Sequence, residues 1–206
     1  MLEGFSSQTR TLDVARLVSL PSKTLGAILI ARGIPLEDID EVEAAVIGVG
    51  VVITATDAIR FTFTRSPIPP QRFNTEHFPA LYTATEESTC LAEIKHHIRE
   101  TFTTLTERRY YQVLHVNFSG STLVTAGHED SHPDLISSTS AGYPFCQALA
   151  EAARSVGHDA LYASSARQAG GRCLPIFSED SLWGATITKT IRFSFDGTQV
   201  RHQILV

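Results

Sequence analysis

The sequence predicts an α+β fold, a core of strands, several of them antiparallel, with helices packed against it. Runs rich in β-branched and aromatic residues outnumber the stretches with helical spacing. Two of these runs, 185–195 and 199–206, flank the dipeptide Asp196-Gly197, a strong signal for a tight β-hairpin. An alanine-rich helix is expected over 145–156, ended by Gly157.

In the first third of the chain we expect helices followed by strands. Residues 11–47 have weak helical spacing and are broken by Gly33 and Pro35, which predicts short helices. Residues 49–64 are β-branched and aromatic, which predicts strands. We therefore divide the chain into a helical lead-in over 1–50 and a main domain over 51–206.

The middle of the chain predicts a strand and a long helix. Three prolines make 66–74 a loop, and 80–84 form a short strand. Thr85 then caps a helix of about five turns that ends near residue 105. Its apolar stripe contains Leu91, Ile94, Ile98, Phe102 and Leu105. Glu93 lies about 200° around the helix from Leu91, so it points away from this stripe.

The remaining segments alternate between strands and loops. Strands are expected over 110–119, 159–164 and 172–177. A polar stretch over 119–140 and the glycine-rich segment 165–171 read as loops.

Composition argues against several classes of function. The formal net charge is −5, which argues against general DNA or RNA binding because such proteins need a basic face. The three cysteines (Cys90, Cys146 and Cys173) are far apart and form no CxxC pair, so neither a disulfide framework nor a zinc site is expected. The longest apolar run, 44–53, is too short to cross a bilayer as a helix. A cytoplasmic protein is expected, and a toxin exported without a signal peptide would look the same.

Glu93 is the first candidate for chemistry. A helix glutamate that faces away from the apolar stripe either is simply solvated or lines a cleft. In a cleft, its carboxylate can stabilise the cation that forms on ribose when an N-glycosidic bond breaks.

Arginines and a tyrosine could bind the rest of such a substrate. The guanidinium groups of Arg60 and Arg72 match phosphate bidentately, although each arginine could equally lie on the surface. The ring of Tyr82 could stack on nicotinamide or pack beside ribose, or it could be an ordinary core residue.

Ser165 opens the loop 165–171, whose N–H groups and hydroxyls could bind a phosphate or an amide, or could serve only the turn. No G-x-S-x-G, GxGxxG or GxxxxGK[ST] motif occurs, so a serine hydrolase, a Rossmann site and a P-loop are not supported. His128 and His132 have i, i+4 spacing but fall in a loop, and no metal site is expected.

Taken together, these stretches resemble the RES domain family, toxins of bacterial toxin–antitoxin pairs that destroy NAD. The resemblance rests on Arg72-Phe73-Asn74, Leu81-Tyr82-Thr83-Ala84 and Leu91-Ala92-Glu93, with ten residues from Arg72 to Tyr82 and eleven from Tyr82 to Glu93. It continues through HVNFS (115–119), QALAEAARSVG (147–157), SARQAGGR (165–172) and CLPIF (173–177), and covers about residues 55–180.

The chain departs from the family pattern around its first arginines. Pro70-Gln71 replaces the usual glycine pair, and Thr75-Glu76-His77 replaces the usual Pro-Pro-Gly. Arg60 is closer to Tyr82 than the first family arginine is expected to be, and Arg65 competes for that assignment.

The resemblance implies a split, mostly antiparallel β core similar to that of ADP-ribosyltransferases, with NAD bound in a cleft as the substrate and no cofactor or metal. Arg60 and Arg72 would hold phosphates, Tyr82 the nicotinamide ribose or ring, and Glu93 the ribosyl cation. Ser165, with Asn74 and Arg167, would complete the NAD site. The products would be nicotinamide and either ADP-ribose or its phosphate, from water or inorganic phosphate as acceptor.

Two other classes stay open. A protein ADP-ribosyltransferase would grip NAD in the same way but use a macromolecular acceptor, and an inert interaction domain could share the fold. The partners implied are an Xre-type antitoxin or another immunity protein, with residues 1–50 as the docking or homodimerisation element. We expect neither direct nucleic-acid binding nor a membrane partner.

Overall fold

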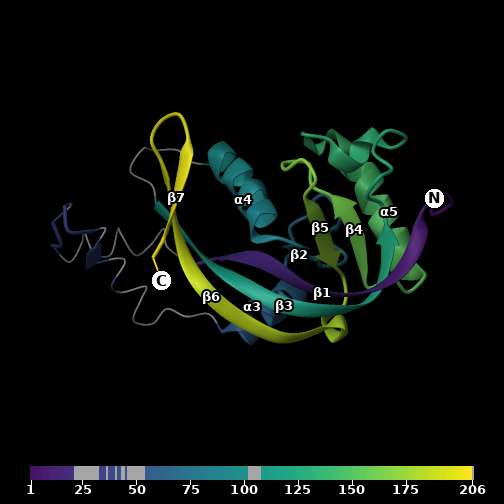
Figure 1. Cartoon of the computed structure of the whole chain (residues 1–206), viewed down its shortest axis with the longest axis horizontal. Coiled ribbons are helices and arrows are strands. Elements are labelled where there is room, and N and C mark those ends of the chain that lie inside the picture. Colours follow the sequence, from purple (N-terminus) through teal and green to yellow (C-terminus); the bar gives the residue numbers. More distant parts are fainter. Residues whose placement is uncertain are drawn as a thin grey trace.

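The computed structural model describes residues 1–20, 33–35, 37–39, 41–42, 45, 54–101 and 108–205. A seven-stranded sheet with flanking helices forms the core (Figure 1). In chain order the main elements are β1 (Ser6–Ser19), α3 (Ala55–Thr64), β2 (Leu81–Ala84), α4 (Glu87–Thr101), β3 (Arg108–Val124), α5 (Tyr143–Ser155), β4 (Ala160–Ser164), β5 (Arg172–Ile176), β6 (Leu182–Phe195) and β7 (Val200–Ile204). Short 3-10 helices η1 (Pro133–Ile136), η2 (Ser140–Gly142) and η3 (Glu179–Ser181) lie in the connections.

The sheet divides at β3. One edge of β3 pairs with β1 without interruption, from Val124 opposite Ser6 to Tyr111 opposite Ser19. The other edge pairs with β6 up to Phe118 and with β4 from Thr122 onward. This change of partner separates a long curved arm, β1–β3–β6–β7, from a small sheet, β2–β5–β4.

The small sheet is also tied to β1. Ala84 of β2 pairs with Ala15 of β1, so β1, β2, β5, β4 and β3 follow one another in a closed ring. Within the described part of the chain, every strand pair is antiparallel except β3 with β4. The predicted α+β class with a mostly antiparallel core is confirmed.

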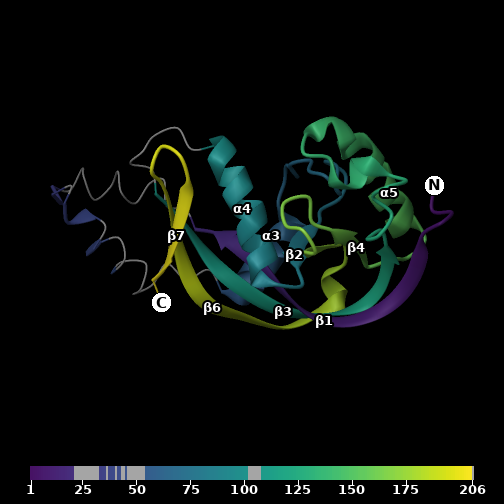
Figure 2. The same cartoon turned by 45° about the horizontal axis from the view of Figure 1, so that its top comes forward.

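Helices α3, α4 and α5 cover different apolar clusters. Helix α4 lies on the concave side of the long arm in both Figure 1 and Figure 2, and packs Cys90 and Ile98 against β1, β3 and β6. Helix α5 buries Leu149 and Ala153 against β4, and α3 buries Ala58 and Ile59 against the ring. Helix α4 and the small sheet both lie on this concave side (Figure 1).

The prediction of helices over 11–47, and of a helical lead-in over 1–50, is wrong where the structure describes its start. Residues 6–19 form β1, with Leu12, Val14 and Val18 packed in one cluster and Ala15 and Leu17 in another. Both faces of this strand are covered over residues 14–18, while residues 6–13 are mostly exposed, so its apolar residues do not alternate cleanly and resemble weak helical spacing. Most of 20–53 lies outside the described residues.

The prediction of strands over 49–64 is also wrong for residues 55–64, which form α3. The side chain of Thr54 accepts a hydrogen bond from the backbone N–H of Asp57 at 3.0 Å, which caps the helix. The Thr-x-x-Asp pattern is the signal that the β-branched composition concealed.

Elsewhere the predicted elements are confirmed with shifted ends. Helix α4 begins at Glu87, two residues after Thr85, while Phe102 and Leu105 lie outside the described residues. Strand β3 extends to Val124, into the predicted loop. Gly157 and Gly197 have φ of +89° and +96°, which the end of α5 and the β6–β7 hairpin require.

An ion-pair network ties the start of α4 to the sheet. Glu87 accepts from Lys189 of β6 at 2.8 Å and lies 2.9 Å from His115 of β3, which is 3.6 Å from Asp13 of β1. Burial raises the pKa of Glu87, but the contacts with Lys189 and His115 outweigh it and hold the pKa below its ordinary value.

We predict that Glu87→Gln lowers the thermal midpoint at pH 7 by about 1–3 °C, because a part-exposed ion pair contributes little. A depressed carboxyl pKa contributes stability above the ordinary glutamate pKa and loses it as the pH falls through the native value. The difference from wild type should therefore disappear in thermal melts at acid pH. The exposed Glu86→Gln is the control, and an equal effect of both variants would contradict the role of Glu87.

Candidate active site

Glu93 lies where α4 faces the small sheet. Its Oε1 accepts a hydrogen bond from Ser165 Oγ at 2.6 Å and lies 3.7 Å from Cys173 Sγ. Ser165 follows the last residue of β4, and Cys173 belongs to β5. From the sequence, Glu93 is either solvated or part of a cleft. In the structure Glu93 is half-buried and contacts two side chains.

The loop after β4 fixes the Ser165 hydroxyl. Its oxygen accepts hydrogen bonds from the backbone N–H groups of Arg167 at 3.0 Å and Gln168 at 3.1 Å. With its acceptor sites filled, the hydroxyl directs its one proton to Glu93. The loop lies close to α4, because a Cβ on Gly171 would stand 2.7 Å from Thr89 Oγ1. Glycine at this position allows Ser165 to reach the helix.

Tyr82 connects β2 to the Arg-Phe-Asn segment. Its hydroxyl accepts from the backbone N–H of Phe73 at 2.7 Å and donates to Asn74 Oδ1 at 3.1 Å. The Asn74 amide donates in turn to the carbonyls of Pro69 and Thr75. Burial raises the pKa of Tyr82 well above its ordinary value, so the phenol stays protonated and this network stays intact.

Two predicted arginines meet at one loop. Arg72 donates to the carbonyl oxygens of Leu135 at 3.2 Å and Ser137 at 2.6 Å. Arg167 donates to the carbonyl of Ser138 at 3.1 Å. Arg167 also belongs to the turn that holds Ser165, so Arg72, the loop 135–138 and the Glu93 pair form one connected set of contacts.

Arg60 and Arg65 are the two candidates for the first arginine of the site, and they lie on or beside α3. Arg60 is exposed on the helix, and Arg65 follows it as the C-cap residue with its guanidinium over the Phe61 ring. The described contacts do not connect Arg60 with Glu93, Tyr82 or Arg72.

Arg16 is a further cation that sequence analysis missed. It lies on β1 and donates to the Tyr82 carbonyl at 3.1 Å, while its buried Nε has no partner among the described residues. Burial lowers the pKa of Arg16 to about 10, and the charge of Arg65 contributes to this shift, so the guanidinium stays charged at neutral pH. If residues 12–18 are interpreted as a strand, Arg16 lies on the same face as Leu12, Val14 and Val18. A charged residue within an apolar face is the sequence signal that could have identified Arg16.

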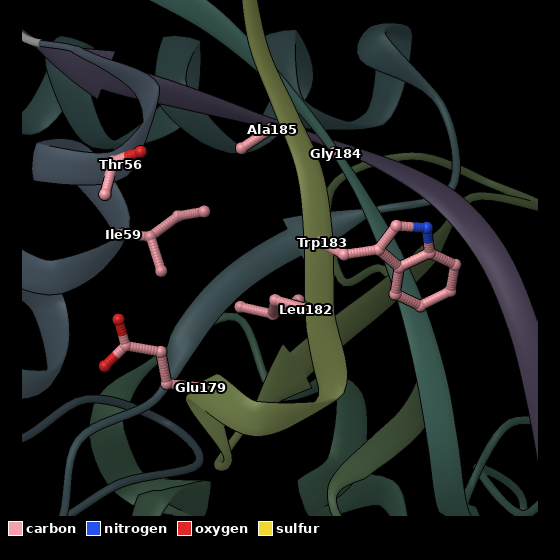
Figure 3. A pocket seen from close by; sticks show the side chains of 7 residues that line it. All are labelled: Thr56, Ile59, Glu179, Leu182, Trp183, Gly184 and Ala185. Atoms are coloured by element: carbon pink, nitrogen blue, oxygen red, sulfur yellow. The ribbon is translucent and has the colours of Figure 1, made fainter.

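A separate hollow lies between α3 and β6 (Figure 3). It has a volume of about 200 Å³ and is lined by Thr56, Ile59, Glu179, Leu182, Trp183, Gly184 and Ala185. None of the candidate residues lines it, so it is distinct from the set around Glu93.

The residues that the structure describes include no group of three histidine, cysteine, aspartate or glutamate side chains that could hold a metal ion. No helix among them is long and apolar enough to cross a membrane.

We predict that Tyr82→Phe lowers the free energy of unfolding by about 1–3 kcal/mol, because the buried N–H of Phe73 and the amide of Asn74 lose their partner. Urea denaturation would measure this loss. Tyr162→Phe is the matched control, since the Tyr162 hydroxyl makes no hydrogen bond within the described chain. Equal stability of the two variants would show that the Tyr82 hydroxyl does not hold this loop.

Comparison with known proteins identifies the family of the chain. No curated protein matches the chain. The family model of the RES domain matches residues 52–196, well over half of the sequence and every predicted site residue. The chain therefore belongs to the RES domain family.

Proposed function

We propose that this protein cleaves the bond between nicotinamide and ribose in NAD, and that it acts as a toxin by depleting NAD. The observation that carries the proposal is the half-buried Glu93 carboxylate, fixed by Ser165 and connected through one loop to the guanidinium groups of Arg167 and Arg72. NAD presents the matching charges: a ribose that becomes cationic as its N-glycosidic bond breaks, and an anionic pyrophosphate.

Glu93 would act on the ribose. As the bond to nicotinamide weakens, positive charge develops on the ribose ring, and a preorganised carboxylate stabilises that charge. Nicotinamide leaves as a neutral molecule because the bonding electrons go to its cationic ring. Water or inorganic phosphate then takes its place on ribose, which makes the enzyme a glycohydrolase or a phosphorylase.

The arginines would bind the pyrophosphate. Arg72 and Arg167 now donate to neutral carbonyl oxygens of the loop 135–138. An anionic phosphate oxygen is a stronger acceptor than a carbonyl and can replace it. Arg16, charged and with an unpaired Nε, is a third candidate, and we prefer it to the exposed Arg60.

Tyr82 and Asn74 would act by holding Arg72. The Tyr82 hydroxyl is committed to Phe73 and Asn74, so only its ring remains to pack beside the nicotinamide ribose. Ser165 would hold Glu93 directly, and its loop would contact the nicotinamide end of the substrate.

The biological setting is part of the same proposal. An NAD-depleting enzyme needs a neutralising partner in the cell that makes it, and an Xre-type antitoxin or another immunity protein would fill that role. The protein would act in the cytoplasm of its own cell or of a cell into which it is injected. Residues 1–50, which contribute β1 to the core, would dock that partner or a second copy.

We expect Glu93→Gln to lower the rate of NAD cleavage by about 100- to 1,000-fold, because the amide keeps the shape but removes the charge. Thermal melts should show a folded variant. The control is Glu100→Gln, which removes an exposed carboxylate from the same helix. Near-normal turnover by Glu93→Gln would mean that the catalytic carboxylate lies elsewhere.

The assay itself separates the candidate reactions. Purified protein is incubated with NAD, with and without inorganic phosphate, and the products are resolved by mass spectrometry. ADP-ribose formed without phosphate indicates a glycohydrolase, and a phosphate-dependent phosphorylated product indicates a phosphorylase. Transfer of label from NAD to protein would favour an ADP-ribosyltransferase, and no loss of NAD in either buffer would refute the proposal.

The arginine assignments predict a change in KM. Arg72→Lys should raise KM for NAD by about tenfold or more, because lysine cannot form the bidentate contact. Arg16→Gln should act in the same direction, whereas Arg60→Ala should change KM by less than about twofold, because Arg60 is exposed and no described contact connects it with Glu93 or Arg72. Steady-state kinetics would decide, and a large effect of Arg60→Ala alone would reverse the assignment.

A further inference from the structure

We propose that Cys173 is a positioning residue for Glu93: its thiol shares Oε1 with the Ser165 hydroxyl and holds the carboxylate with Oε2 available to the substrate. The two donors lie 3.7 Å and 2.6 Å from that oxygen. Oε2 makes no hydrogen bond with any of the described residues. This inference rests on the proposed function, in which Glu93 acts on the ribose.

Both donors come from the end of the small sheet that faces α4. Cys173 of β5 pairs with Ala163 of β4, and Ser165 begins the loop two residues later. The antiparallel pairing therefore brings a thiol and a hydroxyl to the same side of one helix residue. Neither donor depends on the other for its position, since Ser165 is fixed by the N–H groups of its own loop.

The direction of both hydrogen bonds follows from the surroundings. The Ser165 oxygen already accepts two N–H groups, so its proton points to Glu93. Burial, and after it the charge of Glu93, raises the pKa of Cys173 well above its ordinary value, so the thiol keeps its proton and donates it.

A second donor on one oxygen matters because the carboxylate of a glutamate rotates easily. The terminal torsion of Glu is broad and roughly two-fold, so a single hydrogen bond leaves the plane of the carboxylate poorly defined. Two donors on Oε1, one from β5 and one from the loop after β4, fix both that plane and the oxygen that is presented to ribose. Since a thiol is a weak donor, we expect a measurable but modest effect on catalysis.

The first test is kinetic. Cys173→Ala should lower kcat for NAD cleavage by about 3- to 10-fold, the range for loss of one hydrogen bond, with KM within about twofold. Cys173→Ser keeps a donor and should recover kcat to within about twofold of wild type. Cys90→Ala is the control, because this buried thiol lies on α4 but donates to the Ala15 carbonyl. Unchanged kcat in Cys173→Ala, or an equal loss in Cys90→Ala, would overturn the inference.

The second test needs no turnover. The contact implies that the Glu93 carboxylate disfavours the Cys173 thiolate, so Glu93→Gln should lower the thiol pKa and speed the reaction of Cys173 with iodoacetamide at mildly alkaline pH. Peptide mass spectrometry would follow Cys173 against the buried Cys90 and Cys146, with Glu86→Gln as the control variant. Equal alkylation rates in Glu93→Gln and wild type would refute the contact. If the wild-type protein does not cleave NAD, the proposed function is refuted. The alkylation rates then test only the contact between Cys173 and Glu93.

Discussion

The arrangement of the whole molecule depends on the way β3 divides one edge between two partners. It pairs with β6 up to Phe118 and with β4 from Thr122, while its other edge stays with β1 throughout. Because β3 changes partner, the small sheet turns out of the long arm (Figure 1), and α4 lies beside the loop that joins β4 to β5. Glu93 of α4 meets Ser165 of that loop directly.

The charges in this region follow a second constraint. Arginines that lie inside a compact domain need acceptors, and here those acceptors are mainly backbone carbonyls: Leu135 and Ser137 for Arg72, Ser138 for Arg167 and Tyr82 for Arg16. Neutral carbonyls satisfy hydrogen bonds but leave the positive charge uncompensated. A protein with a formal net charge of −5 thus keeps three guanidinium groups bonded to neutral carbonyls rather than to carboxylates. Their uncompensated charge suits a small anionic substrate better than a polymer, which would need a broad basic face.

Sequence reasoning found most of the elements that carry the site and failed where tertiary pairing decides. The stripe of Leu91, Ile94 and Ile98 fixes the orientation of α4, and with it Glu93, because helical periodicity is a local property. Strand β1 was missed because both of its faces are covered over residues 14–18, which removes the alternation that marks a strand. Helix α3 was missed because β-branched residues outweighed a Thr-x-x-Asp cap. The first error concealed Arg16, and no local pattern could have shown that Cys173 approaches Glu93 from a neighbouring strand.

The intervals between the site residues also have a structural cause. Tyr82 lies ten positions after Arg72 because the chain must leave the Arg-Phe-Asn turn and return along β2, where the Tyr82 hydroxyl meets the Phe73 N–H. Glu93 lies eleven positions after Tyr82 because β2 ends at Ala84, α4 begins at Glu87, and a residue nearly two turns into that helix faces the loop after β4. A residue added to the first interval would displace the turn that carries Arg72. One added within the first turns of α4 would rotate Glu93 by about 100° toward the apolar stripe and away from Ser165. The spacing thus follows from the geometry of β2, which meets the Arg-Phe-Asn turn, and of α4, which meets the loop after β4.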